Sequence, residues 1–350
     1  MKFPLRAAIL AAILSFHANA DLSQDFAQAF QAYQQSLQNG SRDDIISAAN
    51  QAFALGGELY GAKHTNTAAL AHNYGLALRE TDAFSAVKLF EMAIEIYEQH
   101  YGVKAVELLD PLIEISRLQS NRKGALAILR RAANLADDKP AAQAGQIKLI
   151  VGQEYLEQQS RHASLLEEAH QVLSEALEPD DTLLIESKVY LAKYHIARKD
   201  YKDAVTLLNQ NMAAFSGLEK THPYEILTRS FLIHAYESLG QSEQATEHCQ
   251  QIGAMQPWED TQEQVPLFRL MPDYPYNAAA TGKTGTVVLN IKVDKEGFVR
   301  DPEVTAQVGP SSFVQAIKDA LKKWRYAPKF ENGKPVEAET EVSFRFYMRG

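Results

Sequence analysis

A triplet of one small, one bulky and one further small residue recurs along most of the chain. An alanine is followed by a bulky residue four positions later and by a small residue three positions after that. The clear copies are Ala49, Phe53 and Gly56; Ala86, Phe90 and Ala93; Ala125, Leu129 and Ala132; and Ala169, Leu173 and Ala176. Weaker copies are Ala204, Leu208 and Asn211, and Ala245, Cys249 and Ile252. The leading alanines are 37, 39, 44, 35 and 41 residues apart, which is the spacing of helix-pair repeats. A small residue lets two helices cross closely, and the bulky residue fills the groove beyond it. We therefore predict an all-helical array of stacked helix pairs over residues 21–255.

Two stretches of this array resemble tetratricopeptide (TPR) repeats. Asp200-Tyr201-Lys202-Asp203-Ala204 and the segment from Leu239 to Ala245 look like the turn and second-helix start of that family, and Pro257 falls where a repeat often ends. The resemblance implies a superhelix with a concave face suited to a peptide or a protein surface. Several tyrosines either line such a groove or pack between repeats: Tyr74, Tyr155, Tyr190, Tyr194 and Tyr236. A helical bundle without repeats is the alternative.

Residues 256–271 lose the helical periodicity and are predicted to be a linker. They contain Pro257, a polar run from Glu259 to Gln264, and Pro266. Four residues around the end of this stretch are too apolar for a free coil, so we expect them to dock the flanking domains together: Val265, Leu267, Phe268 and Leu270.

Residues 272–350 have the pattern of a small α+β domain. Thr286 to Asp294 alternates apolar and polar residues, as a half-buried strand does. Asp294 to Gly297 is a turn, and Phe298 to Val308 is a second strand in which Pro302 indicates an edge or a bulge.

A helix and a last strand complete this domain. Ser312 with Gln315 suggests a capping box. The apolar stripe that follows consists of Phe313, Ala316, Ile317, Ala320, Leu321 and Trp324. A turn at Glu331 to Lys334 precedes the strand from Glu339 to Tyr347. The order strand, strand, helix, strand predicts a three-stranded antiparallel sheet covered by one helix.

The first 20 residues have the pattern of a signal peptide. Lys2 and Arg6 precede an apolar run from Ala7 to Phe16, and Ala18-Asn19-Ala20 matches a cleavage site. We expect the mature chain to start at Asp21, to be soluble and to lack a membrane span. The alternative is an uncleaved segment that anchors the protein in a membrane.

The charge is unevenly distributed between the two predicted domains. From Pro266 onward there are 13 Lys and Arg against 10 Asp and Glu, which leaves a net charge of −14 for residues 21–265. An acidic body argues against nucleic acid or anionic lipid as the main ligand. The basic residues near the end either attract an acidic partner or merely solvate a helix face: Lys318, Lys322, Lys323, Arg325 and Lys329.

Motifs for catalysis, cofactors and metals are absent from the sequence. It contains no G-x-S-x-G, H-E-x-x-H, C-x-x-C, P-loop or G-x-G-x-x-G pattern. Cys249 is the single cysteine, so no internal disulfide can form, and we expect a small buried residue on a helix. We therefore interpret the chain as a non-enzymatic protein without a cofactor.

The terminal domain resembles the C-terminal domain of the TonB energy transducers. The residues that carry the resemblance are Tyr274-Pro275, Gly285, Val287, Val293-Asp294, Gly297, Trp324-Arg325-Tyr326, Pro328, Asn332-Gly333-Lys334 and the last strand. The resemblance implies a periplasmic binding module of Gram-negative cells that contacts outer-membrane transporters. In that family the last strand is implied to receive a short transporter segment, the TonB box. Carried over, the contact residues are Tyr274, Pro275, Glu341, Val342, Ser343, Phe344, Arg345 and Phe346.

The chain also departs from the energy transducers. They have a long proline-rich spacer, whereas the 13 prolines here are scattered singly. We therefore expect a recognition protein that supports transport, with the helical repeats binding a second partner. Two alternatives stay open: an envelope scaffold that binds peptidoglycan or another structural component, and an uncleaved, membrane-anchored transducer in which helical repeats replace the spacer.

Overall fold

The computed structural model describes residues 20–216, 218, 221–255 and 264–348. Residues 1–19 of the predicted signal peptide and residues 256–263 of the predicted linker lie outside the described part. The chain divides into two compact units, one that ends at Ala176 and one that begins at Leu177. Each described helix is too short or too polar to cross a membrane.

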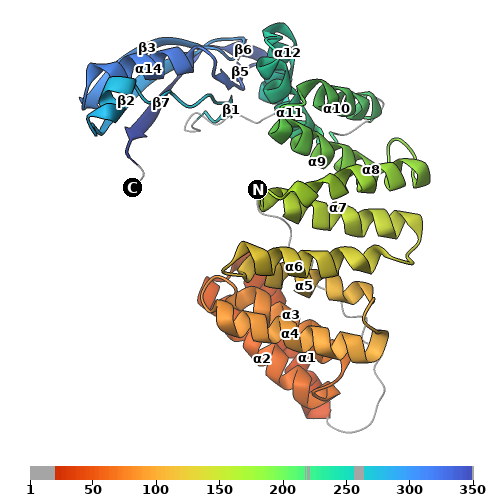
Figure 1. Cartoon of the computed structure of the whole chain (residues 1–350). Helices are drawn as coiled ribbons and strands as arrows, with labels where there is room; N and C mark the ends of the chain where they lie inside the picture. The colour runs from red at the N-terminus through yellow and green to blue at the C-terminus, as the bar shows by residue number, and fades with distance from the viewer. Residues whose placement is uncertain (1–19, 217, 219–220, 256–263, 349–350) are drawn as a thin grey trace. The chain divides into compact units, whose positions relative to one another are not determined.

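The first unit consists of antiparallel helix pairs joined by short turns (Figure 1). Its helices are α1 (Ala20–Asn39), α2 (Arg42–Tyr60), α3 (Thr65–Leu78), α4 (Ala83–Tyr101), α5 (Leu109–Leu118), α6 (Arg122–Ala133), α7 (Ala141–Glu157) and α8 (Leu165–Ala176). Side-chain caps fix where several second helices begin: Ser41 caps α2, Asp82 caps α4 and Asn121 caps α6. Each cap accepts a hydrogen bond from a backbone N–H that lacks a partner within the helix.

The repeated triplets lie on the second helix of each pair, and in two pairs the bulky residue packs on a glycine of the first helix. Phe90 of α4 has no exposed surface, and a Cβ added to Gly75 of α3 would lie 2.7 Å from its ring. Leu173 of α8 covers Gly145 of α7 in the same way, at 2.6 Å. In these two pairs the close crossing that the triplets predict therefore depends on a glycine of the partner helix as well.

The second unit begins with two more helix pairs and continues into the terminal domain (Figure 1). The helices are α9 (Thr182–Arg198), α10 (Tyr201–Phe215), α11 (Glu225–Ser238) and α12 (Ser242–Met255). The triplets at Ala204 and Ala245 lie on α10 and α12, the second helices of these pairs. Cys249 of α12 is buried, as predicted.

The terminal domain consists of one sheet, one covering helix and two small strand pairs. Its elements are β1 (Pro266–Phe268), α13 (Tyr276–Ala280), β2 (Gly285–Val293), β3 (Val299–Val308), α14 (Ser311–Leu321), β4 (Arg325–Tyr326), β5 (Lys329–Glu331), β6 (Lys334–Val336) and β7 (Ala338–Phe346). The main sheet has the order β3–β2–β7, and both pairs are antiparallel. The predicted fold class, a helical-repeat array followed by an α+β domain with a three-stranded antiparallel sheet, is confirmed.

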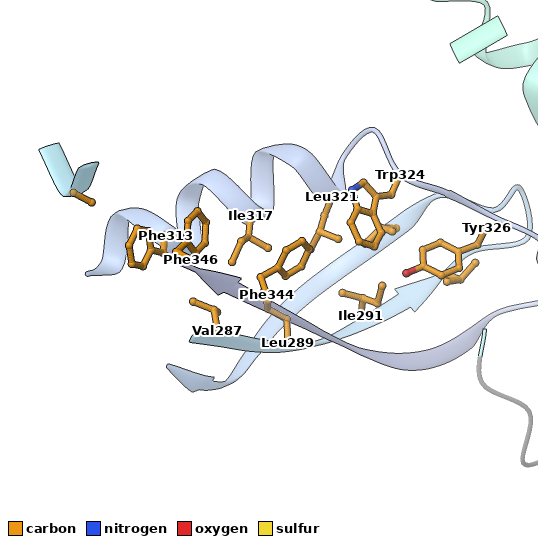
Figure 2. Close-up of a cluster of buried hydrophobic side chains, with 13 residues drawn as sticks. Val287, Leu289, Ile291, Phe313, Ile317, Leu321, Trp324, Tyr326, Phe344 and Phe346 are labelled. Atoms are coloured by element: carbon orange, nitrogen blue, oxygen red, sulfur yellow. The ribbon is translucent and has the colours of Figure 1, made fainter. Parts of the chain in front are cut away.

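The core of this domain lies between α14 and one face of the sheet. Figure 2 shows Phe313, Ile317 and Leu321 pointing from the helix toward β2 and β7. Phe346 stacks on Phe313 with ring centroids 4.0 Å apart, and Phe344 contacts Trp324. The alternation of apolar residues in the sequence thus selects one buried face of the sheet.

The predicted capping box at Ser312 and Gln315 is wrong. The N-cap of α14 is Pro310, two residues before Ser312, and no side-chain hydrogen bond forms at that cap. Gly309 has a φ of 102°, which turns the chain sharply at the end of β3. Pro310 is extended, with a ψ of 146°, and the helix follows it directly, so Ser312 is the second residue of the first turn and cannot act as the N-cap.

Arg325 joins the terminal domain to the last helix pair. Its Nη1 donates to Glu237 Oε1 at 2.8 Å, and its Nη2 donates to Thr246 Oγ1 at 2.7 Å and to the Glu296 carbonyl at 2.9 Å. The guanidinium carbon lies 3.7 Å from the centre of the Phe298 ring. We call Arg325, Glu237 and Thr246 the Arg325 clasp.

Apolar side chains around the clasp also join the terminal domain to α11 and α12. Leu267 and Phe268 of β1 pack against a cluster that includes Ile233 of α11 and Ile252 of α12. The docking expected of Val265 and Leu270 is wrong, because both side chains are exposed. The strand β1 pairs with β4, the strand that carries Arg325. The terminal domain and the pair α11–α12 therefore share one packed boundary.

Candidate functional site

The main sheet has two outer strands, β3 and β7, and they differ in regularity. The pairing of β3 with β2 is interrupted twice, between Val288 and Leu289 and between Asn290 and Lys292. Pro302 lies within the second irregular stretch, as its position in the sequence predicts, and Asp301 has a φ of 45°. Bulges of this kind twist an edge and hinder further pairing.

The strand β7 is regular by comparison. All nine of its residues pair with β2 without a shift, from Gly285 opposite Phe346 to Val293 opposite Ala338. Within the described part of the chain no strand pairs with the other side of β7. A regular strand of this length presents a row of unpaired backbone groups along its outer side.

The hairpin between β2 and β3 determines which residues of β7 face outward. Asp294 donates its N–H to the Phe298 carbonyl across this hairpin. Successive residues of a strand direct their N–H and C=O groups alternately toward its two neighbouring strands. Because Asp294 faces β3, the odd-numbered residues of β2 face β7. Their partners are Ala338, Thr340, Val342, Phe344 and Phe346. The residues between them therefore direct their N–H and C=O groups to the outer side: Glu339, Glu341, Ser343 and Arg345.

The side chains of β7 alternate between the buried and the exposed face of the sheet. Phe344 and Phe346 are buried in the core, and Val342 is half-buried against it. Glu341, Ser343 and Arg345 are exposed on the face of the sheet opposite α14. A segment that pairs with the outer side of β7 would thus meet a hydroxyl between an acidic and a basic side chain.

The Tyr274-Pro275 segment lies at the end of this strand. The Tyr274 ring contacts Phe346 edge-on at 5.3 Å and Phe313 edge-on at 5.6 Å, and its hydroxyl donates to the Lys283 carbonyl. Pro275 is the N-cap residue of α13. The structure therefore brings Tyr274 together with Phe346, while the other site residues named from the sequence follow one another along β7.

Sequence reasoning missed one buried polar group in this domain. The prediction of a solvated basic cluster fits Lys322 and Lys323, which are exposed, but it is wrong for Arg325. Arg325 has no exposed surface because Glu237, Thr246 and the Glu296 carbonyl enclose it. The only local signal is its position between the buried aromatic residues Trp324 and Tyr326.

A polar hollow of about 430 Å³ lies on α10, α11 and α12. Its lining includes Asn209, Arg229, Tyr236 and His248. The Tyr236 and His248 rings stack with an interplanar angle of 8°, and Arg229 donates to Glu225 from two nitrogens. Burial and the nearby Arg229 lower the pKa of His248 to about 4, so its imidazole is neutral at pH 7. The described residues contain no group of three or more side chains arranged to hold a metal ion.

Comparison with known proteins identifies the terminal domain. Residues 271–348 match the family model of the Gram-negative bacterial TonB protein C-terminal domain. The TonB protein of Vibrio cholerae is 28% identical over 82 residues, which are 23% of this chain and 34% of that protein. The chain therefore spans about a third of the length of this relative.

Solved structures resemble the two parts separately. The C-terminal domain of Pseudomonas aeruginosa TonB is 27% identical, with 26% of this chain and 92% of that chain covered and a TM-score of 0.24. A kinesin light chain of Podosopora anserina with nearly identical TPR-like repeats is 19% identical, with 69% and 97% covered and a TM-score of 0.37. Residues 271–348 are thus a TonB C-terminal domain, which in this chain follows a series of stacked helix pairs.

Proposed function

We propose that this chain is a periplasmic protein-interaction protein whose β7 pairs, along its outer side, with an extended segment of an outer-membrane transporter. The observation that carries the proposal is the contrast between the two sheet edges. The edge at β3 is broken by two irregularities, whereas β7 offers nine residues in unbroken register. An added strand needs such a regular edge.

The family match supports the class of partner. C-terminal domains of TonB interact with outer-membrane transporters, and the match covers the whole sheet from β2 to β7. In this proposal the added segment is of the TonB-box type and supports TonB-dependent transport. Tyr274 and Pro275 contact it beyond the end of β7, and Glu341, Val342, Ser343, Phe344, Arg345 and Phe346 form the paired strand.

Backbone hydrogen bonds would provide most of the affinity in this arrangement. The outward N–H and C=O groups of Glu341, Ser343 and Arg345 bond to the added segment, and their side chains select among sequences. Each such hydrogen bond contributes about 0.5–1.5 kcal/mol. Several are needed for measurable binding, which explains why an unbroken register matters.

A titration with synthetic TonB-box peptides tests the proposal. The full chain is titrated by calorimetry, and the Ser343→Pro variant removes an outward N–H and disturbs the extended geometry. We expect Ser343→Pro to weaken binding by about 1–2 kcal/mol, or roughly 5- to 30-fold. Ser343→Ala keeps the backbone donor and should change the affinity much less.

The matched control places the same residue on the other edge. Thr305 lies in the first irregular stretch of β3, so Thr305→Pro should leave peptide binding unchanged. Circular dichroism verifies that each variant is folded. Equal binding by the Ser343→Pro variant would show that β7 is not the site, and no binding of any box peptide at millimolar concentration would favour the envelope-scaffold alternative.

The remaining parts of the proposal concern the rest of the chain. The helix pairs bind a second protein partner, and the chain carries out no catalysis, because a TonB C-terminal domain and stacked helix pairs are both protein-interaction folds. The periplasmic location requires export by the signal peptide predicted at residues 1–20. N-terminal sequencing of protein released by osmotic shock should give Asp21 as the first residue, and an intact start in washed inner membranes would support the anchored alternative.

A further inference from the structure

A hollow of about 270 Å³ lies on the first unit, between α4 and α6 and above α5. Its floor is aliphatic and consists of Ile94, Leu112, Ile115 and Ile128. Small-molecule pockets usually measure about 300–1,000 Å³. This hollow is smaller, so it suits a single long side chain of a partner better than a whole ligand.

Three of the four floor residues are already packed within the unit, and the fourth, Ile128, is half-buried. Leu112 is 2% exposed, and Ile94 and Ile115 are each 6% exposed. These residues do not need a partner to be buried, so the floor keeps its shape with or without one. The hollow is therefore a preformed depression on rigid helices.

The rim of the hollow is acidic. Glu91, Glu95 and Glu98 follow one another at i, i+4 and i+7 on one face of α4, and Arg131 of α6 pairs with Glu98. Among the ion pairs of the described residues none involves Glu91 or Glu95, although Glu95 accepts a hydrogen bond from the Gln99 amide. Two like charges at i, i+4 repel each other and destabilise a helix. The carboxylates of Glu91 and Glu95 therefore do not stabilise α4.

The hollow on α10–α12 occupies the same position within its repeat, and its chemistry is different. When the triplet of α10 is aligned with that of α4, Asn209 takes the position of Glu91. When the triplet of α12 is aligned with that of α6, His248 takes the position of Ile128. Both sets of residues line a hollow, but only the one in the first unit combines an aliphatic floor with an acidic rim. The packing of helix pairs therefore does not require carboxylates at Glu91 and Glu95.

We propose that this hollow receives a lysine or arginine side chain from a basic segment of the second protein partner. The aliphatic stem of such a side chain lies on the floor, while its cationic head reaches Glu91 and Glu95. The net charge of −14 on residues 21–265 attracts the same kind of segment over a longer range. This inference deepens the second-partner part of the proposed function and is independent of pairing at β7.

A fluorescent peptide of alternating lysine and leucine serves as the probe, with a glutamate–leucine peptide as the negative control. Fluorescence anisotropy measures its binding to the full chain at low and at moderate salt. We expect binding of the lysine peptide alone, weakened by salt. The double variant Glu91→Gln/Glu95→Gln should weaken it about tenfold, equivalent to about 1.4 kcal/mol.

Two further variants separate the hollow from general attraction to an acidic surface. The control double variant Asp25→Asn/Glu58→Gln removes two exposed charges elsewhere in the first unit and should change binding less than twofold, that is by less than about 0.4 kcal/mol. Ile128→Trp fills the hollow without changing the charge and should reduce binding as strongly as the loss of both carboxylates.

The outcomes also distinguish this inference from pairing at β7. Ser343→Pro should leave binding of the lysine peptide unchanged, even if that variant no longer binds TonB-box peptides. Equal losses in the two double variants, undiminished binding by Ile128→Trp, or no binding of the lysine peptide at millimolar concentration would each overturn the assignment of this hollow.

Discussion

Arg325 is the side chain whose removal should disturb the second unit most. It has no exposed surface, and the side chain of its partner Glu237 is only 9% exposed. Arg325→Ala leaves Glu237 as an uncompensated buried charge, so we expect the free energy of unfolding to fall by about 3–5 kcal/mol. Urea denaturation followed by tryptophan fluorescence measures the loss.

An exposed ion pair and a double variant provide the controls. Lys322→Ala removes an exposed ion pair with Asp319 and should change the free energy of unfolding far less than Arg325→Ala does. The double variant Arg325→Ala/Glu237→Ala should be less destabilised than the sum of the two single variants. Strict additivity would show that the two side chains do not stabilise each other.

The burial of Arg325 was not predictable from its neighbours in the sequence. Trp324 and Tyr326 point to a core position, yet a charged residue is buried only where partners enclose it. Its partner Glu237 lies 88 residues earlier, on a different kind of element. By contrast, the buried position of Cys249 followed from its place in the repeated triplet.

His248 should make the stability of the second unit depend on pH. Its pKa is lowered to about 4 by burial and by Arg229, against an ordinary value of 6.5. The unfolded chain therefore binds a proton on this residue at a higher pH than the folded chain does. The stabilisation is complete above pH 6.5 and is lost as the pH falls toward 4, by up to ~3 kcal/mol.

The comparison with His248→Gln isolates this residue from the carboxylates around it, which include Glu225 and Glu247. Denaturation at pH 7, 5.5 and 4 should show a steeper loss of stability in the unmodified chain than in the variant. Parallel curves for the two proteins would mean that His248 does not titrate differently on folding.

Among the elements, the contact between α3 and α4 offers a sharp test of repeat packing. A Cβ added to Gly75 would lie 2.7 Å from the buried Phe90 ring, whereas one added to Gly57 of α2 would lie 3.9 Å from its nearest neighbour. We expect Gly75→Ala to destabilise the first unit by about 1–3 kcal/mol through overpacking. Gly57→Ala should instead stabilise it, by up to about 1 kcal/mol, because alanine favours the helix. Thermal unfolding of both variants measures these changes in stability, and equal changes would contradict the close α3–α4 contact.

Long periodic elements were predictable from the sequence, and short ones were not. The strands β2 and β7 alternate over nine residues each, so their period and their buried face could be predicted. The strands β1 and β4 have three and two residues and pair with each other across the chain, which leaves no pattern to detect. Of the candidate site, the residues of β7 could be named from their alternation and their family resemblance, whereas the irregular pairing of β3 emerged only from its register with β2.

At the scale of the whole molecule, the proposed boundaries are a helical part at 21–255, a linker at 256–271 and the TonB C-terminal domain at 272–350. We expect limited proteolysis to cut between Gly253 and Met271. Because the Arg325 clasp and β1 hold the terminal domain against α11 and α12, the two fragments should still elute together after cleavage. Size-exclusion chromatography of the cleaved protein measures this.

The same experiment on the Arg325→Ala variant is the control for the clasp. Its fragments should separate after cleavage. Separation of the fragments of the unmodified protein would contradict the clasp, and cleavage within the helical array in place of residues 253–271 would move the proposed boundary.

The position of the single cysteine has a practical consequence for studying this boundary. Cys249 is fully buried beside the Arg325 clasp, and burial raises the pKa of its thiol to about 11, although Arg325 opposes that shift. A thiol reagent can therefore modify it only when α12 and the terminal domain move apart. Since no other cysteine competes, the rate of alkylation of the unaltered protein reports how often this boundary opens, and whether a peptide bound at β7 changes that frequency.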